Sequence, residues 1–163
     1  MKRLLVVVAA CSGPAVPAST IVDPLPPGAP KRIAGRLQIE PASQCGGAMP
    51  SPDYVPPPMA PAPERMLDVS VGEIYRGHKP ALVLTTDAEG RFEGTLPAGR
   101  YCVTLAGRGP RPANVGPNYD LPCLVKEWER CDAVVDVPVT APIEIEVHEP
   151  CAGLSCYDGP PPP

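Results

Sequence analysis

The chain has 163 residues, a net charge of −4, 27 prolines and seven cysteines. That length suits one domain of ordinary size, and the acidic balance gives no basic face of the kind that nucleic acid requires. With a single Phe, a single Trp and five Tyr, a folded core has to be mainly aliphatic. No run approaches the roughly 20 apolar residues that a transmembrane helix needs.

The first residues have the pattern of a secretory signal. Basic Lys2 and Arg3 are followed by the apolar residues 4–10, by Cys11 and then by small residues. The stretch Val8-Ala9-Ala10-Cys11 resembles a bacterial lipobox. This resemblance implies cleavage before Cys11 and a lipid on the new N-terminal cysteine. The alternative is that Cys11 is an ordinary residue in an uncleaved start.

The lipobox also implies a location for the protein. A lipidated protein of this type is attached to the bacterial cell envelope through its N-terminal lipid. Ser12 after the cysteine resembles the preference for sorting to the outer membrane, where the protein would face the periplasm or the surface. We therefore expect the membrane to be reached through lipid on Cys11, because no segment is long enough to span it.

The remaining cysteines form an even set. Without Cys11, six are left, and an oxidising compartment favours up to three disulfides among Cys45, Cys102, Cys123, Cys131, Cys151 and Cys156. A helix between Cys123 and Cys131 would hold them about 12 Å apart, beyond disulfide reach. Residues 151–156 could close on themselves as a small loop. We prefer an arrangement in which Cys45 and Cys156 or Cys151 tie the long loop and the tail to the sandwich.

Proline clusters divide the chain into segments. Residues 1–10 form the signal peptide, and residues 11–31 form the lipid anchor and a linker, with six prolines between residues 12 and 31. The linker is a semi-rigid spacer that would reach up to about 60 Å if extended. Alternatively, part of it packs on the domain through Ile21 and Val22. A single β-sandwich domain then covers residues 32–157, followed by the proline-rich tail 158–163.

Short strands with period-two alternation fill the domain. They are expected at residues 32–39, 66–71, 81–86, 92–96, 101–105, 133–137 and 143–147. Residues 40–65 and 107–120 are rich in proline or glycine and are expected to be long loops, since proline cannot donate to a sheet ladder. One short helix is expected at residues 121–130, where Leu121, Leu124, Val125 and Trp128 have helical spacing. These elements predict an all-β fold, an antiparallel sandwich of about seven strands.

One segment resembles a known family of β-sandwich domains. Residues 86–92 read Thr-Asp-Ala-Glu-Gly-Arg-Phe, and residues 96–103 continue through Leu-Pro-Ala-Gly-Arg-Tyr to Val103. This is similar to the carboxypeptidase regulatory-like domains, also called prealbumin-like or Cna-B-like, and implies their antiparallel Greek-key sandwich. In the turn, Asp87 is expected to accept backbone hydrogen bonds and Gly90 to adopt a positive φ. Such domains are mostly accessory or structural modules.

Three patterns were weighed as chemical sites. Asp87 and Glu89 are interpreted as turn residues. The alternative is a cation site, but calcium would need a third oxygen ligand, and none is evident. Residues 75–78, Tyr-Arg-Gly-His, are similar to a Tyr-Arg-Gly-Ser motif of transthyretin-type hydrolases, which also need further histidines. His148 with Cys151 and Cys156 lacks the paired spacing of structural zinc sites. No catalytic residue, metal ligand or cofactor is therefore assigned.

The sequence favours a non-enzymatic protein of the envelope. We expect a binding or scaffolding module whose partner, an envelope protein or a glycan, contacts the loops at residues 40–65 and 107–120. A glycan-binding module is one alternative, in which Tyr54, Tyr119 and Tyr157 would be the exposed aromatic residues. A small-molecule hydrolase of transthyretin type is the other alternative.

Overall fold

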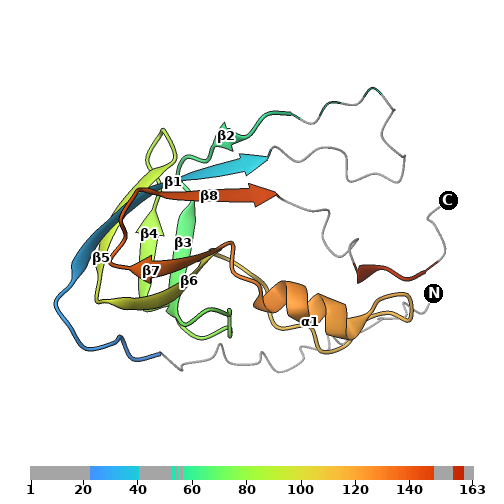
Figure 1. The fold of residues 1–163 in the computed structure, drawn as a ribbon. Coiled ribbons are helices and arrows are strands. Elements are labelled where there is room, and N and C mark those ends of the chain that lie inside the picture. Colours follow the sequence, from blue (N-terminus) through green and yellow to red (C-terminus); the bar gives the residue numbers. More distant parts are fainter. Residues whose placement is uncertain (1–22, 41–52, 54, 56, 149–155, 160–163) are drawn as a thin grey trace, which may run out of the picture.

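The computed structural model describes residues 23–40, 53, 55, 57–148 and 156–159. In chain order the elements are β1 (Lys31–Glu40), β2 (Ala60–Pro61), β3 (Met66–Val71), β4 (Leu82–Thr85), β5 (Arg91–Leu96), β6 (Gly99–Leu105), α1 (Leu121–Glu129), β7 (Ala133–Val137) and β8 (Ile143–His148). Two sheets pack on each other, and α1 lies outside them (Figure 1). The prediction of a mostly β sandwich with one short helix is confirmed at this level.

The first sheet is built around β1. Strand β1 pairs antiparallel with β5 along residues 31–36 and with β2 at Gln38 and Ile39, and it pairs parallel with β8 along residues 35–40. The sequence prediction of antiparallel pairing is wrong for the β1–β8 pair. Residues 138–142 connect β7 in the second sheet to β8 in the first, so these two strands form no hairpin that would impose an antiparallel direction on the sheet.

Strand β2 corrects the prediction that residues 40–65 are loop throughout. Pro61 lies opposite Gln38 and has no N–H to donate, but the next residue, Ala62, donates its N–H to the carbonyl oxygen of Leu37 at 3.2 Å. A two-residue strand at this position tolerates proline because only one side of it is paired. Alternation alone does not reveal so short a strand.

The second sheet has the strand order β4-β3-β6-β7, and all of its pairs are antiparallel. Its inner face and that of the first sheet bury a mainly aliphatic core, as composition requires. The core residues are Ile33, Leu37, Ile39, Ala62, Leu67, Val69, Leu84, Phe92, Leu96, Tyr101, Val103, Val135, Val137, Ile145 and Val147. The hydroxyl of Tyr101 is satisfied within this core because it donates to the carbonyl oxygen of Pro97 at 2.9 Å.

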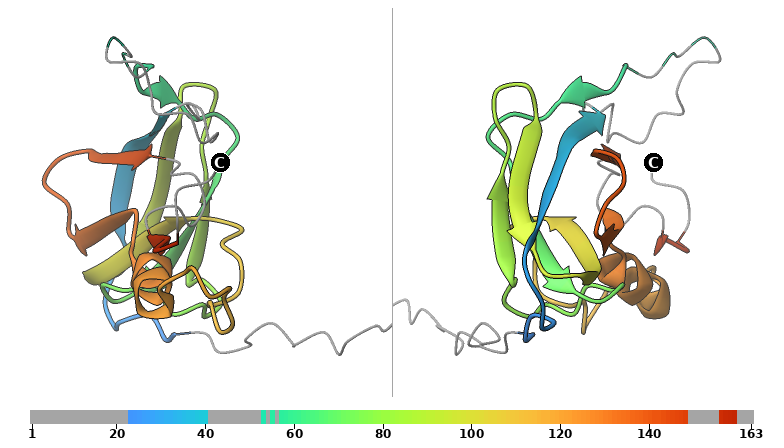
Figure 2. Two further views of the ribbon diagram at one scale, coloured as in Figure 1. Left: turned by 90° about the vertical axis from the view of Figure 1, so that its right-hand side faces the viewer. Right: turned by 60° about the vertical axis from the view of Figure 1, so that its left-hand side comes forward.

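Helix α1 matches the expected helix to within one residue at its C-terminal end. None of its residues is fully buried, so it lies on the sandwich surface rather than between the sheets (Figure 2). Trp128 holds it there: the indole packs edge to face on Tyr75 at 4.8 Å, and its Nε1 donates to the carbonyl oxygen of Gly109 at 2.8 Å. Within the described residues, no helix is long and apolar enough to cross a membrane.

The end of the predicted spacer packs on the domain. Asp23 Oδ1 lies within hydrogen-bonding distance of His78 Nδ1, at 2.9 Å, and both side chains are only about one fifth exposed. Pro26 lies close enough to Gly99 that a Cβ atom there would meet it at 3.0 Å. The alternative in which part of the linker contacts the sandwich is therefore confirmed for these residues. Ile21 and Val22, which were expected to make that contact, lie outside the described residues.

Two disulfides connect α1 to the rest of the molecule. Cys102 of β6 is bonded to Cys131 just after the helix, and Cys123 within the helix is bonded to Cys156 in the tail. The second bond attaches the segment around Cys156 to the helix of the folded domain. Cys123 and Cys131 are bonded to different partners, as their expected separation along the helix requires. Cys11, Cys45 and Cys151 lie outside the described residues.

Candidate functional site

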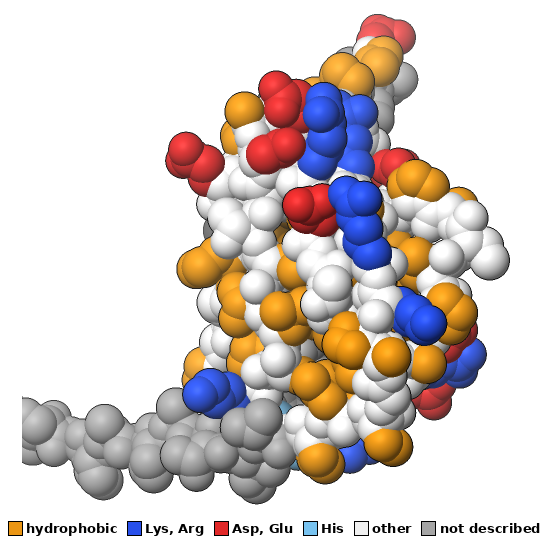
Figure 3. Space-filling model, turned by 90° about the vertical axis from the view of Figure 1, so that its left-hand side faces the viewer, with side chains coloured by type: hydrophobic (Ala, Val, Ile, Leu, Met, Phe, Trp, Pro, Cys, Tyr) orange, Lys and Arg blue, Asp and Glu red, His pale blue; other side chains and the backbone are white. Residues whose placement is uncertain are grey.

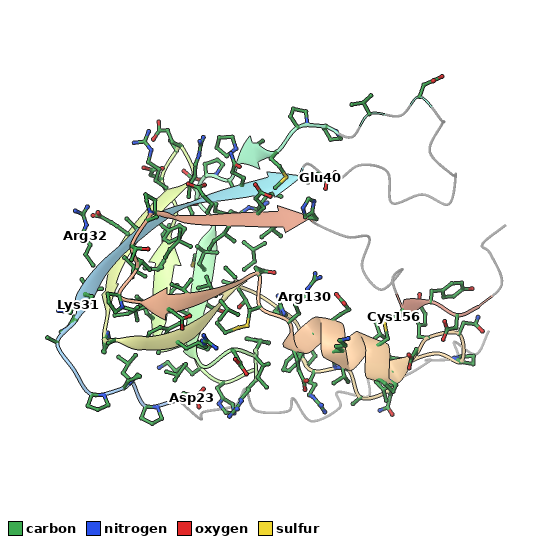
Figure 4. All side chains as sticks on the ribbon, viewed as in Figure 1. Asp23, Lys31, Arg32, Glu40, Arg130 and Cys156 are labelled. Atoms are coloured by element: carbon green, nitrogen blue, oxygen red, sulfur yellow. A yellow bond between two sulfur atoms is a disulfide. The ribbon has the colours of Figure 1, made fainter. Side chains whose placement is uncertain are left out.

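A groove runs across the outer face of the first sheet. Alternation along β1 turns Ile33 and Leu37 into the core, so Arg32, Ala34 and Arg36 point to the opposite side. Ala34 carries only a methyl group and leaves a depression between the two arginines. Arg32 projects from the left-hand side of Figure 4, and Figure 3 views that side, where basic and acidic side chains gather together.

The groove has a volume of about 680 Å³, within the range of small-molecule sites. Three arginines and three acidic residues stand around it, so its formal charges balance. Its lining is formed by Arg32, Ala34, Gly35, Arg36, Thr85, Asp87, Arg91, Phe92, Glu93, Pro142 and Glu144. We call this surface the arginine groove.

The three arginines differ in how far their hydrogen-bonding capacity is used. Arg32 forms an ion pair with Glu93 at 2.7 Å, although both side chains are largely exposed. Arg36 donates from its Nε to the carbonyl oxygen of Glu89 at 3.2 Å, and no carboxylate in the described part of the chain forms an ion pair with it. The side chain of Arg91 makes no hydrogen bond or ion pair among the described residues.

Strand register places the last two arginines side by side. Arg36 and Arg91 are direct partners in the antiparallel β1–β5 pair, and both point outward. Like charges directly opposite each other across a sheet are destabilising. On the other flank of Arg36 lies Glu144, its register partner in β8, which has no ion pair among the described residues. The row Arg91–Arg36–Glu144 therefore presents donors and an acceptor to solvent.

The turn before β5 fixes the position of Arg91. Asp87 Oδ1 accepts the backbone N–H groups of Glu89 at 2.9 Å and Arg91 at 2.8 Å, and Gly90 has a φ of 75°. The expected turn geometry is confirmed. A cation site at Asp87 and Glu89 gains no support, because this carboxylate oxygen is already engaged by the backbone. No group of three or more His, Cys, Asp or Glu side chains in the described part of the chain is placed to hold a metal ion.

The residues of the hydrolase-like motif serve packing contacts. The Tyr75 ring is buried between Trp128 and the guanidinium of Arg108, whose Cζ lies 5.1 Å from the ring centroid. Burial and the nearby charge of Asp68 raise the pKa of Tyr75. His78 is paired with Asp23. The other histidine, His148, forms its own ion pair with Glu40 at the far end of the first sheet.

The loop at residues 107–120 is anchored at its start. Arg108 donates to the carbonyl oxygens of Trp128 at 2.7 Å and Arg130 at 2.6 Å, and it contacts Asp132 at 3.3 Å. Asp132 in turn accepts the N–H of Leu105 at 2.7 Å. We call Tyr75, Arg108, Trp128 and Asp132 the helix bracket, because these residues hold α1 to the second sheet. The first part of this expected partner loop thus has a structural role.

Two of the tyrosines considered for glycan binding, Tyr119 and Tyr157, contact each other. Tyr119 and Tyr157 meet edge to face with their ring centroids 5.2 Å apart and form an isolated β-bridge. Their planes cross at 68°, so they do not form the flat platform on which a sugar ring stacks. Tyr54, the third tyrosine considered for a glycan site, lies outside the described residues.

The sequence prediction missed the arginine groove. Arg32 and Arg36 share a strand face by simple alternation, which is a readable signal. Their meeting with Arg91 and Glu144 depends on the register of β5 and β8 against β1, which no local pattern specifies. Comparison with known proteins adds no template for the site: no family model, curated protein or solved structure matches this chain.

Proposed function

We propose that this chain is a lipoprotein of the bacterial outer membrane, tethered through Cys11, whose β-sandwich is a non-enzymatic binding or scaffolding module. The observation that carries the binding role is the arginine groove. Arg36 and Arg91 hold charged donors on an open face with no carboxylate partner among the described residues. Charged groups presented in this way are available to a ligand or partner, at the cost of mutual repulsion.

We further propose the finer fold type, a Greek-key sandwich of the carboxypeptidase regulatory-like kind. Support comes from the hairpin that carries the resemblance. Asp87 caps the turn, Phe92 is buried at the start of β5, and the Tyr101 ring lies in the core with its hydroxyl bonded to Pro97. These residues hold the framework that positions Arg91, so the family-like segment forms one wall of the groove.

Glycan binding and transthyretin-type hydrolysis remain the alternative functions. The first would use stacking aromatic residues, and Tyr119 and Tyr157 pack on each other instead. The second would use converging histidine and arginine side chains, and His78 and His148 make separate ion pairs. The charged groove supports recognition of a charged partner better than it supports either alternative.

The tether is tested by fractionating cells that express the full chain or its Cys11→Ser variant. The full chain is expected in the outer-membrane fraction, with a mass that includes lipid on the N-terminal cysteine. The serine variant is expected to lose both properties. Membrane association that is unchanged by Cys11→Ser would contradict the lipoprotein assignment.

The binding face is tested in living cells with a photo-crosslinking amino acid. Placed at position 34, in the floor of the arginine groove, it is expected to yield a defined crosslinked product. Placed at Val83, which is half exposed on the edge strand of the other sheet, it serves as the matched control. Equal products from both positions, or none from position 34, would argue against a partner on the groove.

A further inference from the structure

The row Arg91–Arg36–Glu144 has a definite order of charges. Two cationic side chains lie on adjacent strands, and one carboxylate lies on the third strand in register with them. A guanidinium pair suits a carboxylate, which it can bind through parallel N–H donors. A free carboxylate such as that of Glu144 suits an ammonium group. A ligand that satisfies the whole row therefore carries a carboxylate at one end and an ammonium at the other.

The spacing of the row sets the length of that ligand. Neighbouring strands lie about 4.8 Å apart. The distance from a point midway between Arg91 and Arg36 to the strand of Glu144 is therefore about one and a half spacings, or about 7 Å. An extended chain covers about 3.5 Å per residue, so two residues cover about 7 Å. A dipeptide therefore has the length to reach from one strand position to the other.

The rest of the groove agrees with a zwitterion. Asp87, Glu93 and Glu144 line the same groove as the three arginines, so a multiply charged anion such as phosphate would face carboxylates on several sides. A zwitterion brings no net charge. The small side chain of Ala34, two residues before Arg36 on the same face of β1, leaves space beside the row, and Pro142 offers an apolar wall for a ligand side chain. The volume of about 680 Å³ also exceeds what a single small anion would fill.

We propose that the arginine groove binds short zwitterionic peptides of about two residues, with the peptide carboxylate on Arg36 and Arg91 and the peptide ammonium on Glu144. This inference rests on the proposed binding function and specifies its ligand. It concerns the chemistry of the groove alone and is independent of the lipid on Cys11. The ligand would also relieve the repulsion between Arg36 and Arg91.

The test is calorimetric titration of the full chain in detergent with Ala-Ala. Two blocked analogues dissect the binding: N-acetyl-Ala-Ala lacks the ammonium, and Ala-Ala amide lacks the carboxylate. Ala-Ala is expected to bind, with each analogue about tenfold weaker or more, since each loses a charge-assisted hydrogen bond. Inorganic phosphate is expected to bind more weakly than Ala-Ala. Tighter binding of phosphate, or equal binding of all three peptides, would overturn the proposal.

Variants assign the two ends of the ligand. Arg91→Gln and Glu144→Gln should each weaken Ala-Ala about tenfold or more. Glu144→Gln should leave N-acetyl-Ala-Ala unaffected, because that analogue has no ammonium to lose. Lys31→Gln on the same strand as Arg36, and Glu146→Gln one row along from Glu144, are the matched controls and should bind as the wild type does. A chain that crosslinks at position 34 but does not bind Ala-Ala would retain the proposed function and lose this inference.

Discussion

The outer faces of the two sheets differ in solvent exposure, although both are formed by the same alternation of side chains along a strand. On the first sheet, β1 turns Arg32, Ala34 and Arg36 outward, and these side chains stay exposed or half-buried. On the second sheet, β6 turns Cys102 and Thr104 away from the shared core, yet both are almost completely buried. Small neutral side chains allow other parts of the chain to close over one face. Long charged side chains keep the other face open to solvent.

We call the outer face of the second sheet the closed face and the outer face of the first sheet the open face. The closed face is covered by segments that are attached through a disulfide and hydrogen bonds. Cys102 is bonded to Cys131, and the helix bracket attaches α1 through Arg108 and Trp128. The open face depends on few such contacts: its ion pair between Arg32 and Glu93 lies at the surface, where such pairs contribute little. Stability should therefore be lost by substitutions on the closed face, and binding by substitutions on the open face.

The largest effect is expected from removing a disulfide of the closed face. Replacing both Cys102 and Cys131 by Ala should lower the free energy of unfolding by about 3 to 4 kcal/mol, because the bond closes a long loop in the unfolded chain. Denaturant unfolding of the variant and the wild type measures the difference. Replacing Cys123 and Cys156 should cost a similar amount, since the sequence separations are 29 and 33. If each double variant lost less than about 1 kcal/mol of the free energy of unfolding, the disulfides would not stabilise the closed face as argued.

Arg108 is expected to give the next largest effect. Arg108→Ala removes two hydrogen bonds to carbonyl oxygens at the end of α1, the contact with Asp132 and the stacking on Tyr75. We expect a loss of about 2 kcal/mol, the scale of hydrogen bonds to a charged group in a partly buried site. Arg111→Ala, which removes only the exposed pair with Glu129, is the matched control and should cost less than about 1 kcal/mol.

Local features of the chain could be predicted from the sequence better than contacts between distant segments. Strands such as Ile143–His148 and the turn at Asp87 are local features, where alternation or one side chain decides the structure. The parallel pairing of β8 with β1 is not local, and neither is the disulfide between Cys123 and Cys156. Both depend on which segments meet after the sheets have packed.

The arginine groove shows the same limit more sharply. The three arginines of the groove lie at separate positions in the sequence, and nothing in their spacing says that Arg36 and Arg91 become direct partners. A shift of one residue in the β1–β5 register would turn one of the two arginines toward the core. The register is set by burying Ile33, Phe92 and Leu96 together, so the site is a consequence of core packing. The geometry of the groove therefore depends on the packing of the core beneath it.

A buried hydroxyl on the closed face offers a smaller, stabilising test. Among the described residues, Thr104 Oγ1 is buried without a hydrogen-bond partner, an arrangement that costs free energy. Thr104→Val keeps the side-chain shape and removes that polar group. We expect a gain of about 1 kcal/mol, seen as a higher midpoint of thermal unfolding. Thr85→Val, on exposed edge strand β4, provides the control and should change stability by less than about 0.5 kcal/mol.

The smallest expected effect comes from the repulsion between Arg36 and Arg91 on the first sheet, and it tests the difference between the two faces most directly. If Arg36 and Arg91 repel each other across the ladder, Arg91→Gln should stabilise the ligand-free protein by about 0.5 kcal/mol, and high salt should remove most of that gain. Arg36→Gln should gain less, because Arg36 also loses its hydrogen bond to the Glu89 carbonyl. Lys31→Gln, outside the groove, should show neither effect. Thermal unfolding at low and high salt measures all three variants.

If Arg91→Gln lowers the stability, Arg91 supports the fold, and the side chains of the open face would then contribute to stability as those of the closed face do. A salt-sensitive gain would mean that the first sheet keeps an unfavourable charge pair, which a bound carboxylate would relieve.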